Sequence, residues 1–259
     1  MVINPMSLDG RTILVTGAGQ GIGRGIAEIS GALGARVVLC DMNEQTLAET
    51  AAAIGKDRTR TYVGSVADAK FVEHMVDDAS KNFGPIDGLV NNAGITRPAM
   101  ITKMTTEQWD QVIAVNLTGV YLCLQAVGKR MIDRHKSGVA DPGAIVNVSS
   151  DAGLRGTIGQ INYGAAKSGV LGISMSAARE WARYNIRVNS VCFGVVITPM
   201  TNTVRTDKRF AEDYLSRIPL GRFSTPEEVA KPVCFLLSSA ASYITGQYMA
   251  INGGMHIAV

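Results

Sequence analysis

The chain has 259 residues, of which 46% are hydrophobic and 18% are charged, and its formal net charge is +3. This length suits one large α/β domain or two small ones, and the apolar content excludes a disordered chain. The small net charge and the lack of any lysine or arginine block give no support for nucleic-acid binding.

The cysteines and histidines are scattered, without the short spacings of a disulfide framework or a metal site. They are Cys40, Cys123, Cys192 and Cys234, and His74, His135 and His256. We expect the cysteines to be reduced core residues of a cytoplasmic protein, and we expect no bound metal. The first residues lack the apolar segment of a signal peptide, and polar residues interrupt the longest apolar run, 112–127. We therefore expect no membrane span.

Strand-like and helix-like patterns alternate along the chain. Predicted strands cover residues 11–16, 36–41, 59–64, 86–91, 143–149, 186–192 and 247–251. Predicted helices cover 22–33, 68–83, 106–135, the stretch around Tyr163, and 226–237. Residues 199–224 are less regular. The alternation predicts an α/β fold with one domain over residues 1–259: a Rossmann-type, doubly wound parallel sheet of about seven strands with helices on both faces.

A glycine-rich loop joins the first strand to the first helix. Gly17, Gly21 and Gly23 have the spacing GxxxGxG, whereas GxGxxG does not fit and no Gly-Lys-Ser/Thr of a P-loop follows. Glycines let a backbone approach a pyrophosphate, and a helix N-terminus offers free N–H groups and a positive dipole end. The pattern favours dinucleotide binding over an ordinary tight turn.

Asp41 ends the second predicted strand, 18 residues after Gly23. A carboxylate at about this spacing binds the adenosine ribose of a dinucleotide and repels a 2′-phosphate. We therefore expect NAD rather than NADP, although Asp41 could instead cap the following helix.

Further polar residues gather where the predicted strands end, which is the edge of a parallel sheet that binds ligands. Asn91 to Gly94 end one strand, and Ser150 follows another. Asn116 lies inside the apolar helix 106–135. Asparagine competes for backbone hydrogen bonds there, which predicts a local distortion or a polar role, with a satisfied core amide as the alternative.

Tyr163 and Lys167 are four residues apart in a predicted helix, so their side chains share one face. A free tyrosine has a pKa of about 10, and a nearby cation favours the phenolate. The pair therefore suggests a tyrosine that exchanges protons near neutral pH, although such spacing alone is usually an ordinary helix face.

In combination, these motifs resemble the short-chain dehydrogenase/reductase family from about residue 8 to 254. The matching segments are TGAGQGIG at 16–23, NNAG at 91–94, Asn116, Ser150 and YGAAK at 163–167. The resemblance implies hydride transfer between a nicotinamide cofactor and a ketone or secondary alcohol. It gives Tyr163 the role of general acid or base and Ser150 that of hydrogen-bonding the substrate oxygen.

The same resemblance assigns the remaining roles. Lys167 would lower the pKa of Tyr163 and hold the nicotinamide ribose, and Asn116 would hold a water in a proton relay. The implied cofactor contacts, together with Tyr163 and Lys167, are Gly17, Gln20, Gly21, Ile22, Gly23, Asp41, Ser65, Val66, Asn91, Ala93, Gly94, Val196 and Thr198. Two departures from the family pattern are Phe193-Gly194 for the usual Pro-Gly, and Ser65-Val66 for the frequent Asp-Val.

The substrate is less well defined. Residues 199–217 resemble the substrate lid of the family, and an apolar pocket of Leu154, Ile158, Phe193 and Met200 suits a medium or bulky ketone. A 3-oxoacyl thioester reductase is the alternative, and a non-catalytic NAD(P)-binding sensor is the rival from another class. The family usually forms homotetramers, and the small residues Ala165, Ser168, Gly169 and Gly172 are compatible with close packing between subunits.

Overall fold

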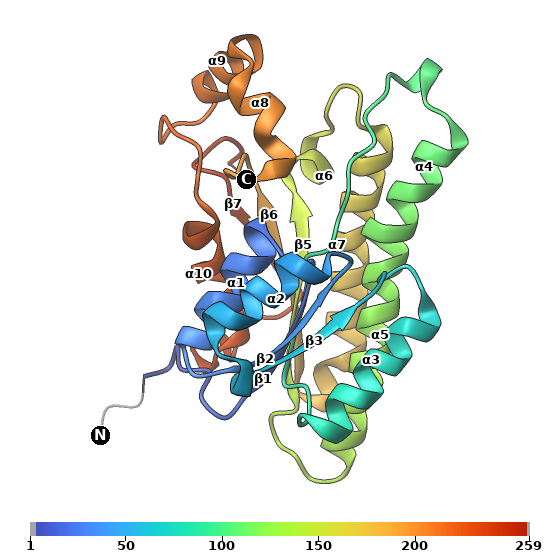
Figure 1. The fold of residues 1–259 in the computed structure, drawn as a ribbon, viewed down its shortest axis with the longest axis vertical. Coiled ribbons are helices and arrows are strands. Elements are labelled where there is room, and N and C mark those ends of the chain that lie inside the picture. Colours follow the sequence, from blue (N-terminus) through green and yellow to red (C-terminus); the bar gives the residue numbers. More distant parts are fainter. Residues whose placement is uncertain (1–3, 258–259) are drawn as a thin grey trace.

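The structure, a computed structural model, describes residues 4–257 and has a central sheet of seven parallel strands in the order β3-β2-β1-β4-β5-β6-β7 (Figure 1). The strands are β1 (Thr12–Thr16), β2 (Arg36–Asp41), β3 (Thr59–Val63), β4 (Gly88–Asn91), β5 (Gly143–Ser150), β6 (Ile186–Phe193) and β7 (Tyr248–Ile251). The predicted doubly wound parallel sheet is thus confirmed.

Helices cover both faces of the sheet. They are α1 (Gly21–Ala32), α2 (Glu44–Ile54), α3 (Ala69–Asn82), α4 (Thr106–Ile113), α5 (Gly119–Lys136), α6 (Asp151–Arg155), α7 (Ile161–Trp181), α8 (Asn202–Thr206), α9 (Lys208–Ser216) and α10 (Pro226–Leu237). Helices α1, α2 and α10 pack on one face, and α3, α5 and α7 pack on the other (Figure 1). Helix α2 was not predicted from the sequence.

The molecule has two hydrophobic cores, one on each face of the sheet, and successive side chains along a strand point into them alternately. In β1, Ile13 and Val15 join the core under α1 and α10, whereas Leu14 joins the core under α3 and α5. All three are fully buried. Because both faces of the sheet are covered, the central strand β1 is buried at every position, whereas the edge strand β3 is largely exposed.

The predicted helix 106–135 is interrupted where Asn116 lies. A π-helical segment, Ala114–Thr118, separates α4 from α5, which confirms the predicted distortion. The run Thr106–Lys136 is apolar and long enough to cross a membrane. Its side chains Cys123, Val127 and Met131 are instead fully buried against the sheet, as expected of a core helix.

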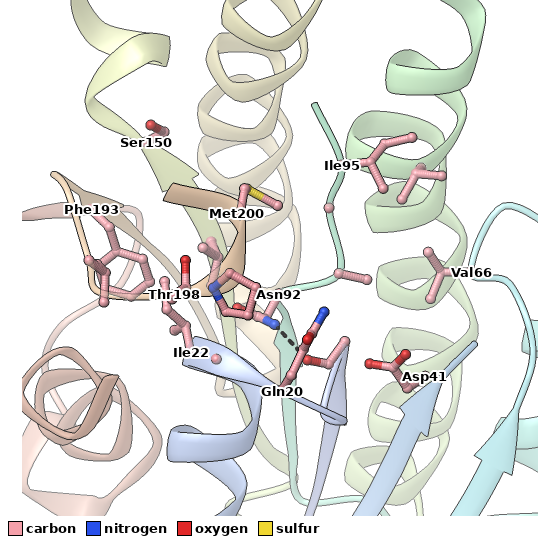
Figure 2. A pocket seen from close by; sticks show the side chains of 18 of the residues that line it. Gln20, Ile22, Asp41, Val66, Asn92, Ile95, Ser150, Phe193, Thr198 and Met200 are labelled. Atoms are coloured by element: carbon pink, nitrogen blue, oxygen red, sulfur yellow. Dashed lines mark hydrogen bonds between the residues drawn. The ribbon is translucent and has the colours of Figure 1, made fainter. Parts of the chain in front are cut away.

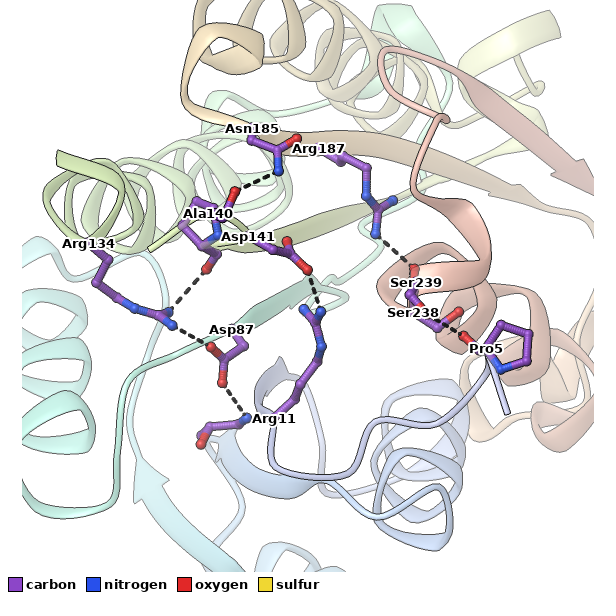
Figure 3. A network of polar contacts seen from close by, with 12 residues as sticks. Pro5, Arg11, Asp87, Arg134, Ala140, Asp141, Asn185, Arg187, Ser238 and Ser239 are labelled. Atoms are coloured by element: carbon purple, nitrogen blue, oxygen red, sulfur yellow. Dashed lines mark hydrogen bonds and ion pairs between the residues drawn. The ribbon is translucent and has the colours of Figure 1, made fainter. Parts of the chain in front are cut away.

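The amino ends of the strands are joined by a polar network (Figure 3). Arg134 Nη2 lies 2.7 Å from Asp87 Oδ1, and Asp87 Oδ2 accepts a hydrogen bond from the N–H of Thr12 at 2.9 Å. Arg11 pairs with Asp141 in the same region. These contacts stabilise the end of the sheet opposite the pocket described next.

Candidate active site

A pocket of about 340 Å³ opens beyond the carboxyl ends of the strands, the edge at which parallel sheets bind ligands (Figure 2). Fourteen of the seventeen residues predicted for the site line it. They are Gly17, Gln20, Gly21, Ile22, Asp41, Ser65, Val66, Ala93, Gly94, Ser150, Tyr163, Lys167, Val196 and Thr198. Gly23, Asn91 and Asn116 do not line it.

The glycine loop forms one side of this pocket. Gly17 and Gly21 have positive φ angles of 65° and 56°, which glycine adopts without strain. A Cβ on Gly17 would lie 2.9 Å from the Cα of Ala93, so the loop lies directly against the neighbouring segment. The side chain of Gln20 makes no capping hydrogen bond to the N-terminus of α1. The first two residues of α1, Gly21 and Ile22, line the pocket. This cradle fits the pyrophosphate of a dinucleotide.

Gly23 shapes the loop from behind the pocket. A Cβ at this position would lie 1.9 Å from the carbonyl oxygen of Gly17. Glycine is therefore required at residue 23 for the packing of α1 against the loop, and Gly23 is not part of the pocket lining.

The carboxylate of Asp41 is fixed at the end of β2. Its Oδ2 accepts a hydrogen bond from the N–H of Gly19 at 2.9 Å, and its Oδ1 accepts one from the N–H of Asn43 at 3.0 Å. Asn43, rather than Asp41, caps α2. Asp41 therefore presents its negative charge to one end of the pocket, and Ser150 lies toward the other end (Figure 2).

Two asparagines, the half-buried Asn92 and the fully buried Asn116, hold the pocket wall that follows β4. Asn92 Nδ2 donates to the carbonyl oxygens of Thr16 and Gly17 at 3.0 and 3.1 Å. Asn116 accepts from the N–H of Ile95 at 2.8 Å and donates to its carbonyl at 3.0 Å. Both ends of its side-chain amide thus bind the backbone of Ile95, which lines the pocket.

Asn91, which the family resemblance placed among the cofactor contacts, lies away from the pocket, and its neighbour Asn92 takes the position on the pocket wall. Asn91 is buried inside the sheet, where its Nδ2 donates to Asn147 Oδ1 at 2.8 Å. Asn92 lines the pocket instead. Successive residues at the end of a strand point to opposite sides, so only one of the two can face the pocket.

Ser150, Tyr163 and Lys167 meet at the other end of the pocket. Ser150 ends β5, and its hydroxyl accepts the N–H of Ala152 at 3.2 Å. The ammonium of Lys167 lies 5.7 Å from the centre of the Tyr163 ring and donates to the carbonyl of Val148 at 2.7 Å. The predicted catalytic face of α7 is therefore assembled beside Ser150.

Burial dominates the electrostatics of this group. It raises the pKa of Tyr163, and the Ser150 hydroxyl beside the phenol partly lowers it. Burial also lowers the pKa of Lys167 to about 8. The pKa of Tyr163 is therefore shifted upward, opposite to the lowering by Lys167 that the sequence predicted, because desolvation disfavours the charged form of both groups.

Asn162, which the sequence analysis did not single out, fixes the start of α7. It is fully buried, and its Nδ2 donates to the carbonyls of Arg97 and Gln108 at 3.0 and 2.9 Å. Its Oδ1 accepts the N–H of Tyr163 at 2.8 Å. Its partners Arg97 and Gln108 are distant in the sequence, so no local pattern predicts this role. The one available signal is that Asn162 directly precedes Tyr163.

The apolar part of the pocket differs in two residues from the one predicted. Phe193 and Met200 line it, whereas Leu154 and Ile158 do not. Ile158 is 88% exposed, in a turn between Gly156 and Gly159, both of which have positive φ. Ile95, Val115 and Val148 supply apolar surface in their place.

A family model described as enoyl-(acyl carrier protein) reductase matches residues 17–256. The chain belongs to the short-chain dehydrogenase/reductase family. The 3-oxoacyl-(acyl-carrier-protein) reductase FabG of Thermotoga maritima is 43% identical over 97% of this chain and 100% of the relative. The enzyme of the same name from Vibrio harveyi is 39% identical, with the same coverage of both chains.

Solved structures of the family share the whole fold. A gluconate 5-dehydrogenase of Burkholderia cenocepacia, in complex with NADP and tartrate, has a TM-score of 0.92 and 32% identity, and the match covers 98% of both chains. A protein described as a 2-deoxy-D-gluconate 3-dehydrogenase of Agrobacterium tumefaciens, with bound NADP, has a TM-score of 0.89 and 35% identity, covering 98% of this chain and 99% of its own. As a member of this family, the chain is an NAD(P)-dependent oxidoreductase that transfers a hydride between a nicotinamide cofactor and a ketone or secondary alcohol.

Proposed function

We propose that the chain reduces the ketone of 3-oxoacyl thioesters with NADH. The observation that carries this proposal is the apolar surface beside Ser150 and Tyr163, to which Ile95, Phe193 and Met200 contribute. Lys167 is the one cation among the described residues that line the pocket. A ketone with an acyl chain suits this lining better than a sugar acid, whose carboxylate would need a cationic partner.

The curated relatives support the same substrate class. Several of them, 37–43% identical over nearly the whole chain, are 3-oxoacyl-(acyl-carrier-protein) reductases. A 3-oxoacyl thioester is itself a ketone, so this proposal narrows the ketone class expected from the sequence.

In the proposed reaction, the bound nicotinamide supplies the hydride to the carbonyl carbon. Tyr163 donates its phenolic proton to the carbonyl oxygen, and the Ser150 hydroxyl donates a hydrogen bond to that oxygen and orients it. The product is the 3-hydroxyacyl thioester. Lys167 holds the cofactor ribose and favours the phenolate that remains on Tyr163, and the Asn116 segment lies on the route by which a proton returns from solvent.

The preference for NADH over NADPH rests on the fixed carboxylate of Asp41. Two amides hold this carboxylate in place, so it cannot turn away from a 2′-phosphate without losing both hydrogen bonds. The only cation on the described pocket lining, Lys167, lies beside Tyr163 rather than near Asp41. The solved relatives named above hold NADP, so the two cofactors need to be compared directly.

The same proposal includes a cytoplasmic homotetramer. Large apolar side chains on α5 and α7 are exposed, with Tyr121 at 46% and Met175 at 51%. The small residues Ala165, Ser168 and Gly172 are also exposed on α7, where they allow close approach of a second helix. Sedimentation of the intact chain tests this, and a monomer at micromolar concentration would contradict it.

Loss of reduced-nicotinamide absorbance tests the proposed reaction. NADH and NADPH are compared in parallel with an acetoacetyl thioester, a longer 3-oxoacyl thioester, simple ketones and gluconate, the last assayed with the oxidised cofactors. We expect NADH oxidation with the thioesters, faster for the longer chain. Faster turnover of gluconate than of any thioester would contradict the substrate class. NADH binding without turnover of any substrate would indicate the sensor function instead.

A further inference from the structure

Asp151, the residue after Ser150, is a buried carboxylate that none of the roles above uses. It is 7% exposed, and both of its oxygens have partners. Oδ1 accepts from Asn252 Nδ2 at 2.9 Å, and Oδ2 accepts from Arg155 Nη2 at 3.0 Å. A carboxylate withdrawn from water requires such partners, so its position is tightly restricted.

Asn252 organises the segment that follows β7. Its Nδ2 also donates to the carbonyl of His256 at 3.2 Å, and its Oδ1 accepts the N–H of Gly254 at 3.1 Å. A Cβ on Gly194 would lie 2.9 Å from the Cβ of Asn252, so Asn252 packs directly against the backbone of Gly194. Gly194 lines the pocket. Asn252 therefore lies directly behind the pocket wall.

The hydrogen bond between Asp151 and Asn252 thus connects two walls of the pocket. Ser150 and Phe193 are register partners in β5 and β6, so the residues that follow them leave the sheet side by side. Arg155 adds a second link, because its Nη1 donates to the carbonyl of Met255 at 3.3 Å. Helix α6, which Ser150 caps, has only five residues. Such a short helix is marginal alone, so its position depends on these contacts.

We propose that Asp151 is a positioning residue, which holds the Ser150 hydroxyl toward the substrate oxygen by anchoring α6 to residues 252–256. This role concerns the hydride transfer common to the family and does not depend on the substrate proposed above. If the contact contributed to stability alone, its loss would unfold the chain without altering the chemistry of the folded enzyme.

Exchanging the side chains of Asp151 and Asn252 distinguishes a role in positioning Ser150 from a role in stability alone. Asn252→Asp places two carboxylates against each other, which repel when both are ionised. Asp151→Asn with Asn252→Asp restores the hydrogen bond between the two residues with donor and acceptor exchanged, while the bond from residue 252 to the carbonyl of His256 stays lost, as in Asn252→Asp alone. Each variant is assayed with a ketone that the wild type reduces, measuring kcat, the KM for NADH, the pH profile and the folded fraction by circular dichroism.

We expect Asn252→Asp to lower kcat by about tenfold, the effect of losing a hydrogen bond to a charged group. Its KM for NADH should change little, because Asp41 and the glycine loop are untouched. Displacement of Ser150 removes a contact that lowers the Tyr163 pKa. The alkaline decline of the reduction rate should therefore move to higher pH. The double variant should recover most of the lost kcat.

Asp141→Asn is the matched control. It weakens the ion pair with Arg11 at the opposite end of the sheet (Figure 3). It should leave kcat and the pH profile unchanged, whatever its effect on thermal stability. The proposal is overturned if the double variant is no more active than Asn252→Asp alone. It is also overturned if the loss of kcat equals the loss of folded protein and the pH profile does not move.

Discussion

The ammonium of Lys167 lies 5.7 Å from the centre of the Tyr163 ring, one helical turn away on α7. It donates to the carbonyl of Val148 at 2.7 Å and is 2% exposed. The carbonyl offsets only part of the cost of burying a cation. Lys167 is therefore retained at a cost in stability, as expected of a residue kept for function.

The cost of burying Lys167 predicts that the difference in stability between the wild type and Lys167→Met depends on pH. Burial lowers the Lys167 pKa from its ordinary 10.5 to about 8. Between these values the unfolded chain binds the proton and the folded chain does not. The free energy of unfolding of the wild type should therefore rise with pH over this range, by up to about 3 kcal/mol. Lys167→Met should lack this rise.

Urea unfolding of both proteins between pH 7 and pH 10 measures the effect. The same comparison in a Tyr163→Phe background removes the contribution of the phenol, whose titration the Lys167 charge affects. Lys167→Met should be most stable relative to the wild type at pH 7 and should lose that advantage toward pH 10. A difference between the two proteins that stays constant with pH would show that Lys167 is not buried as a costly cation.

The fixed carboxylate of Asp41 predicts a shift in cofactor use. Asp41→Ala removes the repulsion of a 2′-phosphate and the acceptor for the ribose hydroxyls. The ratio of kcat/KM for NADPH to that for NADH should rise by about tenfold, in the range of a lost charge-assisted hydrogen bond. Asp57→Ala, an equal change of charge at an exposed residue outside the pocket, should leave the ratio unchanged. A wild type that strongly prefers NADPH would contradict the argument.

Phe193 should restrict the size of the substrate as well as stabilise the core. It is 4% exposed and lines the pocket. Phe193→Ala should cost about 3–5 kcal/mol of stability, as for other buried phenylalanines, and should raise kcat/KM for branched ketones relative to linear ones. Phe235→Ala is the control, because Phe235 packs against the same core outside the pocket. It should lower the melting temperature without changing the ratio between substrates.

Most of the framework could be predicted from local sequence. Buried strands such as Arg36–Asp41 are apolar runs with distinct boundaries, and the structure gives β2 the predicted limits. The distortion at Asn116 followed from a polar residue inside an apolar helix, and it appears as the π-helical segment. These features depend on patterns within a few residues, which sequence periodicity records.

The parts that could not be predicted depend on long-range contacts. Helix α2 (Glu44–Ile54) has a weak apolar pattern, and it becomes recognisable only when Leu47 and Ala51 meet the sheet. Nothing near Asn162 indicates its bond to Gln108, 54 residues away, and nothing near Asp151 indicates its bond to Asn252, 101 residues away. The apolar side chain of Ile158 suggested a place in the pocket, but the turn between Gly156 and Gly159 exposes it to solvent.

Tyr163→Phe tests the central claim most directly. The variant keeps the ring and removes the phenolic proton. NADH binding is measured by fluorescence, and NADH oxidation is measured with the ketone that the wild type reduces best. We predict an unchanged Kd for NADH and a kcat lower by about 100- to 10,000-fold, the range that a general acid contributes. Turnover close to that of the wild type would contradict the role of Tyr163 as the general acid.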